Sequence, residues 1–293
     1  MLVGLLKDKV IDGRRVAADV RRGVAEEIHA ALERRPELRP PSLVTVLVGD
    51  DPASQVYLRI KAKACAEVGV KSRREVVPAS ISLEELKEFV KSLSDDPLVD
   101  GVLVQLPLPG RLRAHQEEVV NVVAPDKDVD GFTHVNNGRL AYGDESMAAC
   151  TPKGIVHLLE VEGVELDGAE VVVINRSNVV GKPLALLLLN RNATVTVCHS
   201  RTRELPKVTS RADVLVVAIG RPLFVTPEFV KDGAVVVDVG TNRHEGKLVG
   251  DCHFDALLPH VSKITPVPGG VGPMTVATLL RNTLHAWKLH VGL

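Results

Sequence analysis

The sequence lacks the features that mark several special classes of protein. Its four cysteines lie far apart and form no CxxC pair, which argues against a disulfide framework or a zinc site; they are Cys65, Cys150, Cys198 and Cys252. No apolar run approaches the ~20 residues that a membrane helix needs. Residues 1–6 are apolar, but the run is too brief for a signal peptide.

Charge of one sign is also missing. Lys and Arg together number 36 and Asp and Glu 37, so the net charge is −1 and no basic surface is available for nucleic acid. We therefore expect no nucleic-acid partner, no membrane association and no metal, and reduced thiols in a cytoplasmic protein.

The composition and length fit a globular protein of two domains. Hydrophobic residues make up 45% and charged residues 25% of the 293 residues, and single cores usually stop growing near ~250–300 residues. Short β-rich runs alternate with helical patterns, which predicts an α/β fold with mostly parallel sheets. In the first half we predict strands at residues 42–48, 74–77 and 101–106, a helix at residues 54–68, and a further helix that begins at the capping box of residues 82–85.

The second half is a fresh α/β series that follows a linker-like stretch at residues 136–149. Thr151 suits the N-cap of a helix and Pro152 its first position. We predict strands at residues 170–174, 193–198, 213–218, 234–239 and 263–265, and helices at residues 181–190 and 276–289. The pattern of the last helix does not decide to which domain it belongs.

A loop is predicted at residues 265–275, where three prolines and three glycines stand among eleven residues. Proline lacks a backbone N–H and glycine adopts conformations closed to other residues, so the stretch is not expected in a helix or a central strand. Its apolar residues do not suit a solvated linker. It is either a rigid loop whose bare backbone lies against a flat ligand, or an ordinary tight turn before the next helix.

A strand–turn–helix pattern at residues 171–183 suggests a phosphate site. The strand leads into Asn175 and the helix begins near Gly181, which places free N–H groups and the helix dipole at the turn. The usual G-x-G-x-x-G is absent, so a plain βα turn remains open. The next strand ends at Ser200 and Arg201, and with Arg176 these residues favour the 2′-phosphate of NADP over NAD; the alternative is a polar strand end in solvent.

A second group of polar residues lies in the first half. Tyr57 and Lys61 are four residues apart on a predicted helix and therefore share one face. Gln105 lies at the carboxyl end of a predicted apolar strand, where α/β proteins bind ligands, and a lysine is a suitable partner for its amide. Residues 127–131 (Lys-Asp-Val-Asp-Gly) form an acidic turn that presents one carboxylate to a cationic or amidine-like group. A Tyr/Lys pair on a helix is also common by chance.

Taken together, these motifs resemble the methylenetetrahydrofolate dehydrogenase/cyclohydrolase family. The matching stretches cover nearly the whole chain in the family's order; they are residues 54–64, 104–109, 127–132, 150–154, 176–183, 197–202, 250–251 and 265–275. The resemblance implies two reactions. A hydride passes from the methylene carbon of 5,10-methylenetetrahydrofolate to NADP, and water then opens the methenyl cation to 10-formyltetrahydrofolate.

The resemblance also implies roles for individual residues. Lys61 is the central acid/base group, Gln105 orients it, and Tyr57 packs beside the folate. Asp130 accepts hydrogen bonds from the pterin. Further contacts with the folate are expected from Pro268, Gly269 and Gly270. The residues expected to bind NADP are Thr151, Asn175, Arg176, Ser177, Ser200, Arg201 and Thr241.

The architecture implied by the resemblance is a folate-binding catalytic domain and a Rossmann-type NADP-binding domain with a cleft between them. The expected bounds are residues 1–149 for the first and 150–273 for the second, with the helix at residues 274–293 packing back on the first. The folate site and the loop at residues 265–275 would lie in that cleft. A homodimer formed through the nucleotide domains is also implied.

This chain departs from the family at three positions. Asn175 stands where glycine is usual, Thr241 where isoleucine is usual, and Ala149 where proline is usual. From the side chain of Asn175 we predict weaker NADP binding than a glycine would give. The remaining alternatives are an enzyme with only one of the two activities, a folate- or nucleotide-binding module without catalysis, and a dehydrogenase for a carboxylic acid.

Overall fold

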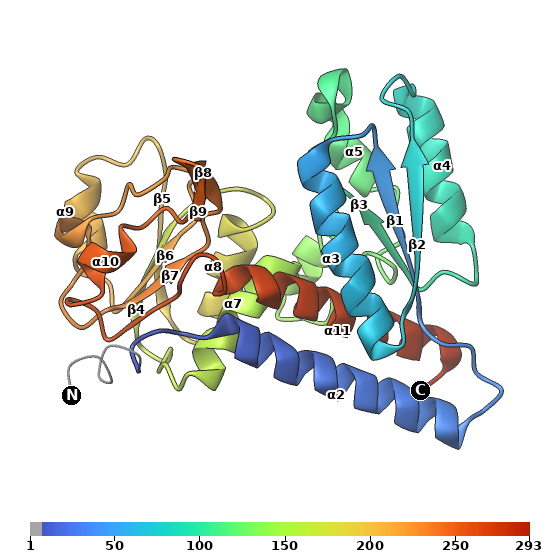
Figure 1. Cartoon of the computed structure of the whole chain (residues 1–293), viewed down its shortest axis with the longest axis horizontal. Helices are drawn as coiled ribbons and strands as arrows, with labels where there is room; N and C mark the ends of the chain where they lie inside the picture. Colours follow the sequence, from blue (N-terminus) through green and yellow to red (C-terminus); the bar gives the residue numbers. More distant parts are fainter. Residues whose placement is uncertain (1–7) are drawn as a thin grey trace. The chain divides into compact units, whose positions relative to one another are not determined.

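The computed structural model describes residues 8–293, which form two compact units (Figure 1). Of the described residues, 18–150 and 276–293 make up the three-strand unit, and 8–17 and 151–275 make up the five-strand unit. Residues 1–6, judged above too short for a signal peptide, lie outside the described part. Within that part, none of the helices has the length and apolar character to span a bilayer.

The three-strand unit contains a small parallel sheet with β1 in the centre. The strand order is β2–β1–β3, with β1 at Ser42–Val48, β2 at Lys71–Val77 and β3 at Gly101–Val104. The central strand is a continuous apolar run because both of its faces are covered, whereas the edge strand β2 carries four charged residues. The helices of this unit are α2 Gly13–Arg34, α3 Pro52–Val68, α4 Leu83–Asp95, η1 Gly110–His115, α5 Gln116–Val120, α6 His134–Ala141 and the end of α11 Val271–Val291.

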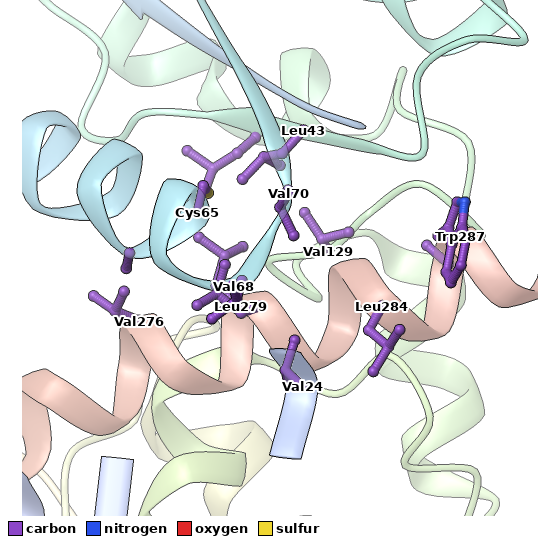
Figure 2. Packing of buried hydrophobic residues seen from close by; sticks show 14 of the residues in the cluster. Val24, Leu43, Cys65, Val68, Val70, Val129, Val276, Leu279, Leu284 and Trp287 are labelled. Carbon is purple, nitrogen blue, oxygen red and sulfur yellow. The ribbon is translucent and has the colours of Figure 1, made fainter. Parts of the chain in front are cut away.

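Two hydrophobic clusters cover the two faces of this sheet. Alternate residues of a strand point to opposite faces, so Leu43 joins one cluster and Val44 the other. The Leu43 cluster includes residues of α2, α3 and α11, and Figure 2 shows Leu279, Leu284 and Trp287 from α11 among its members. The Val44 cluster is closed by α4 and by the segment that leads into α5.

Polar contacts hold the end of α11 in the three-strand unit. The buried Trp287 donates its indole N–H to the carbonyl of Arg39 at 3.0 Å. The Arg39 guanidinium makes two bonds to the fully buried carboxylate of Asp100, at 2.5 and 2.9 Å, and the ring of His290 lies 3.0 Å from the same carboxylate. These partners are far from α11 in the sequence, so they fix the helix along its last two turns.

The five-strand unit is built on a parallel sheet with the strand order β10–β7–β6–β4–β5. Its strands are β4 Glu170–Ile174, β5 Thr194–Cys198, β6 Val214–Val217, β7 Val235–Asp238 and β10 Lys263–Ile264, and a separate hairpin is formed by β8 Asn242–His244 and β9 Lys247–Val249. Its helices are α7 Cys150–Val161, α8 Gly181–Leu189, α9 Leu205–Thr209, η2 Pro227–Phe229 and α10 Phe254–Leu257. The inner strands β6 and β7 are buried throughout, as expected for a sheet covered on both faces.

Three predictions from the sequence are wrong. The linker-like stretch contains α6, because Thr133 caps a helix there by accepting the Asn136 N–H. Helix α7 begins at Cys150, so Thr151 lies inside its first turn rather than at the N-cap. Helix α11 begins at Val271, so the second half of the predicted loop is helical; Pro273 is its third residue, where the N–H has no partner in the helix.

The structure also divides the chain differently at its N-terminus. Val10 bridges Ile264 on β10, and the Ile11 N–H donates to the carbonyl of the same residue at 2.9 Å. The described residues before α2 therefore pack with the five-strand unit, whereas the sequence analysis placed them in the first domain.

All four cysteines are free and buried. Burial raises the pKa of the Cys65 thiol to about 11, and it also raises the pKa values of Cys198 and Cys252. The thiolate is the reactive form, so the raised pKa values lower the reactivity of these three thiols at neutral pH.

Candidate active site

Tyr57 and Lys61 lie one turn apart on α3. Asp51 precedes the helix and accepts the Ser54 N–H at 2.7 Å, and Gly69 ends it with a φ of 85°. Because both ends are fixed by the local chain, the four-residue spacing places the two side chains on one face. Tyr57 is 46% exposed, so its ring is accessible to a ligand.

Lys61 and Gln105 are in contact, as the sequence predicts. Gln105 directly follows β3, and its backbone N–H donates to the Val46 carbonyl at 2.9 Å. Its side-chain Nε2 donates to the Leu106 carbonyl at 2.9 Å, which leaves Oε1 to accept from Nζ of Lys61 at 3.2 Å. The amide is thus held in one orientation, and it directs the ammonium group.

The two carboxylates of the acidic turn have different tasks. Asp128 is 2% exposed. Its oxygens accept hydrogen bonds of 2.8 to 3.1 Å from the backbone N–H groups of Gly131, Phe132 and Thr133 and from Nδ2 of Asn136. Lys127 is also engaged in the fold, since its Nζ donates to the Asp96 carbonyl at 2.7 Å. Asp128 therefore builds the turn, whereas none of these bonds uses the carboxylate of Asp130.

Asp130 lies within the electrostatic range of Lys61. Burial raises the pKa of Asp130, and the positive charge of Lys61 acts against this rise. The thiol of Cys150 also lowers this pKa by hydrogen bonding. Lys61 of α3 thus contacts Gln105 at the end of β3 and acts electrostatically on Asp130 of the acidic turn.

In the five-strand unit, the side chain of Asn175 closes the turn between β4 and α8. Its Oδ1 accepts the N–H groups of Ser177 at 2.7 Å and Gly181 at 3.0 Å, and its Nδ2 donates to the Ala218 carbonyl at the end of β6. A Cβ at Gly181 would lie 2.1 Å from the Asn175 carbonyl oxygen, so only glycine fits there. Asn175 thus acts as a helix cap. It occupies backbone N–H groups that bind a phosphate in other strand–turn–helix sites.

Exposed cations lie at the carboxyl ends of the neighbouring strands β4 and β5. Ile174 and Cys198 are partners in the ladder, and the chain continues from them to Arg176 and Arg201, both exposed. Ser200 between them is exposed as well. This charge and hydroxyl content fits a bound phosphate monoester. His199 is structural, because its Nδ1 accepts the Arg201 N–H at 3.1 Å.

Three further residues of the five-strand unit are predicted to bind the nucleotide: Ser177, which belongs to the turn closed by Asn175, and Thr151 and Thr241, which lie elsewhere in the unit. The hydroxyls of Thr151 and Thr275 are 2.9 Å apart, and Ser177 Oγ accepts the Val180 N–H at 3.1 Å. Thr241 is exposed beyond the end of β7.

Residues 266–270 form a tight turn. The Gly270 N–H donates to the Pro266 carbonyl at 2.9 Å, and Gly269 has a φ of 114°. Gly270 is buried, and its carbonyl oxygen would lie 1.8 Å from a Cβ at Gly13. Its close approach is therefore to the start of α2, while Pro268 remains exposed to a ligand.

The sequence analysis missed a pair of buried carboxylates, Asp238 and Asp251. The Asp251 side chain accepts the backbone N–H groups of Ile219, Gly220 and Arg221 at 2.6 to 3.1 Å and Nδ2 of Asn242 at 2.8 Å. Asp238 accepts the N–H groups of Gly240, Asp251 and Cys252 at 2.8 to 3.0 Å. Together they hold the loops that follow β6 and β7. The sequence signal for Asp251 was the Gly250–Asp251 dipeptide, which is one of the motifs of the family resemblance.

This pair gives the protein a distinctive pH dependence. Burial, followed by the charge of Asp251, raises the pKa of Asp238 from 3.8 to about 6, against the effect of the backbone N–H groups. Between the two pKa values, the folded state binds a proton that the unfolded state has released. The free energy of unfolding should therefore fall by about 3 kcal/mol as the pH rises from 3.8 to about 6. Urea unfolding from pH 4 to pH 7 measures this fall.

The control for this prediction is Asp238→Asn, which cannot titrate. Exposed carboxylates with lowered pKa values, such as Asp213 beside Lys231, give the opposite slope in both proteins. The wild type should therefore lose more stability with rising pH than the variant. Equal slopes in the two proteins would contradict the prediction.

The fold and the two groups of residues define a class of protein, a two-domain α/β enzyme in which one domain binds a dinucleotide. The model of the tetrahydrofolate dehydrogenase/cyclohydrolase catalytic domain matches residues 11–130, and that of the NAD(P)-binding domain of the same family matches residues 149–291. The chain belongs to the tetrahydrofolate dehydrogenase/cyclohydrolase family, which confirms the resemblance drawn from its motifs.

Relatives align with nearly the whole chain. The bifunctional protein FolD of Halothermothrix orenii is 50% identical, over 96% of this chain and 99% of that protein. The crystal structure of the bifunctional FolD dehydrogenase/cyclohydrolase of Campylobacter jejuni has a TM-score of 0.91 and 42% identity, over 96% and 98% of the two chains. That of Trypanosoma brucei, complexed with NADP and an inhibitor, has a TM-score of 0.90 and 38% identity, over 96% and 98%.

The function follows from this membership. The chain is a methylenetetrahydrofolate dehydrogenase and a methenyltetrahydrofolate cyclohydrolase, as the motifs imply, and its three-strand and five-strand units correspond to the catalytic and NAD(P)-binding domains.

Proposed function

We propose that Lys61 is the central acid/base group, that it activates water in the hydrolytic step, and that Gln105 and Asp130 complete its site. The 3.2 Å hydrogen bond from Nζ of Lys61 to Oε1 of Gln105 is the observation that carries this proposal. A fixed amide places the amino group in one direction, and general acid–base catalysis depends on such placement. Tyr57, one turn earlier on α3, supports the flat ring of the folate.

The chemistry assigns one task to each residue. The carboxylate of Asp130 accepts hydrogen bonds from the amino group and ring N–H of the pterin, a charge-assisted contact that fixes the ring. In the hydrolytic step, a water oxygen bonds to the methenyl carbon while the amine of Lys61 takes a proton from that water. The hydroxyl formed in this way then gives up its proton as its oxygen becomes the formyl C=O. The C–N bond to one ring nitrogen breaks, that nitrogen receives a proton, and 10-formyltetrahydrofolate is formed.

We propose NADP as the cofactor, which accepts the hydride in the first step when it is bound. The exposed Arg176 and Arg201, with Ser200, suit its 2′-phosphate, and the relative from Trypanosoma brucei was crystallised with NADP. Ser177, Thr151 and Thr241 are further proposed contacts on the five-strand unit, and Pro268 to Gly270 a proposed contact for the folate.

Asn175→Gly should bind NADP about 2- to 10-fold more tightly than the wild type. The substitution frees the N–H groups of Ser177 and Gly181 for a phosphate, and a hydrogen bond is worth about 1 kcal/mol. The variant should also be less stable by about 2 kcal/mol, because it loses the bonds that close the turn. Fluorescence titration with NADP and thermal unfolding measure the two effects.

A matched control is Asn192→Gly, since Asn192 is exposed in the same unit and has a positive φ of 60° that glycine tolerates. This change should leave NADP affinity unaltered. Unchanged or weaker NADP binding by Asn175→Gly would refute the explanation.

The function is tested by supplying purified protein with 5,10-methylenetetrahydrofolate and either NADP or NAD. Reduced cofactor and the absorbance of the methenyl product are followed together. We expect faster reduction of NADP than of NAD, and removal of the methenyl product faster than its spontaneous hydrolysis. Failure of either step would identify an enzyme with one activity, and failure of both a binding module.

We also propose that the protein is a cytoplasmic homodimer. Among residues 8–293, the edge strand β5 pairs only with β4, and its Val197 is exposed, which suits pairing with a second copy. Light scattering at micromolar concentration should give twice the mass of one chain, and a monomer would reject the dimer.

A further inference from the structure

We propose that Asn282 on α11 is a positioning residue for folate binding, because it holds the backbone that carries Asp130. This inference rests on the role proposed above for Asp130. Asn282 is fully buried, although it is polar and lies on a helix otherwise rich in apolar residues. A buried amide is retained at a cost unless its hydrogen bonds are made.

The amide of Asn282 joins two segments that are distant in the sequence. Its Nδ2 donates to the carbonyl of Val129 at 3.0 Å and to that of Ala148 at 3.1 Å. Val129 is the residue before Asp130, and Figure 2 shows its side chain in the cluster with α11. The amide therefore sets the distance between the acidic turn and the segment before α7.

The same two segments touch each other without intervening side chains. Gly131 has a φ of 75°, and a Cβ there would lie 2.5 Å from the Ala149 nitrogen. The Cys150 N–H donates to the Asp130 carbonyl at 3.2 Å, and the Cys150 thiol donates to the Val129 carbonyl at 3.1 Å. The backbone at Asp130 is thus held through the carbonyl of Asp130 and through that of Val129.

This arrangement explains how α11 influences the position of the Asp130 side chain through the backbone that carries it. Asp128 shapes the acidic turn from within, and Lys127 anchors its start through bonds to Asp96 and Val102. The Val129 carbonyl holds the part of the turn next to Asp130. If Asn282 loses its donors, the Val129 carbonyl keeps the weaker donor of the Cys150 thiol, and the peptide before Asp130 is held less firmly. The carboxylate would then be misplaced for the pterin, while the nucleotide residues of the five-strand unit would be unaffected.

The experiment compares Asn282→Leu, which keeps the size and removes the donors, with Thr283→Val as the matched control. Thr283 is the next residue on α11, is equally buried, and bonds only within the helix, to the Leu279 carbonyl at 2.8 Å. We expect Asn282→Leu to raise KM for methylenetetrahydrofolate about 10-fold and to change KM for NADP less than 2-fold. Thr283→Val should leave the ratio of the two KM values as it is.

A double-variant cycle with Asp130→Asn separates positioning from a general loss of packing. Because Asn282 is proposed to act through Asp130, adding Asn282→Leu to Asp130→Asn should raise KM for the folate less than 2-fold further. If Asn282→Leu does not fold, Asn282→Ser, which retains a shorter donor, should give about a 3-fold increase.

Three outcomes would overturn the proposal: an equal rise of both KM values, full additivity in the cycle, or an unchanged folate KM in both Asn282 variants. If Asp130→Asn alone leaves KM for the folate unchanged, the role of Asp130 itself fails. Any rise in the folate KM that Asn282→Leu still caused would then not act through the Asp130 carboxylate.

Discussion

Replacing Lys61 with methionine should abolish the cyclohydrolase activity, with a loss of about 10³- to 10⁴-fold in kcat. Methionine keeps the length and apolar character of the side chain but has no group that transfers a proton, and a general acid–base group contributes about 10²- to 10⁴-fold. The methenyl product should accumulate to the level set by its spontaneous hydrolysis. Loss of its absorbance after a pulse of methenyltetrahydrofolate measures the rate.

Lys63→Met is the control, because Lys63 is an exposed lysine on the same helix, two residues further on. It should keep the activity of the wild type. Folding of Lys61→Met is checked by thermal unfolding, which should match that of the wild type. Hydrolysis by Lys61→Met within 10-fold of the wild-type rate would remove Lys61 from its proposed role.

Asp130→Asn should weaken the binding of methylenetetrahydrofolate by about 100-fold. The carboxylate accepts two donors of the pterin in the proposed complex, and a charge-assisted bond is worth about 1.5–3 kcal/mol. An amide presents one donor to the same ring and loses the charge. KM for the folate, determined at saturating NADP, measures the effect, and KM for NADP should stay within twofold.

Asp128→Asn provides the contrasting control two residues earlier. The Asp128 carboxylate accepts four hydrogen bonds within the turn. In the variant, the side-chain NH₂ group of the asparagine would face at least one of these donors and could not accept its hydrogen bond. We expect a loss of about 2–4 kcal/mol in the free energy of unfolding. If Asp128→Asn were stable and Asp130→Asn unfolded, the assignment of the two carboxylates would be reversed.

The strands could be predicted from the sequence because their signal is local. Continuous valine and isoleucine runs gave the buried strands β1, β4, β6 and β7 within one or two residues. Helix α6 was missed because Asn136 and Gly138 have poor helix propensity, while the cap at Thr133 and the burial of Leu140 stabilise it. The start of α11 was missed because proline and glycine, which disfavour a helix interior, are tolerated in its first turn.

The candidate functional residues also fall into two groups, those that a local pattern in the sequence predicts and those that depend on contacts between distant segments. Tyr57 and Lys61 could be paired from their spacing, and the Lys61–Gln105 contact from the need of an amide for a partner. The bonds of Asn175 to Ala218 and of Asn282 to Val129 join residues that are 43 and 153 positions apart. No local pattern distinguishes such amides from exposed ones, so their partners became visible only in the folded chain.

The burial of all four cysteines has a practical consequence for spectroscopy. A maleimide dye attacks a thiolate, so a single cysteine introduced on the surface would be labelled in the presence of the natural ones. Tyr142, 95% exposed at the end of α6, is a suitable attachment point. A second dye in the other unit would then allow the distance between the units to be followed in solution during turnover.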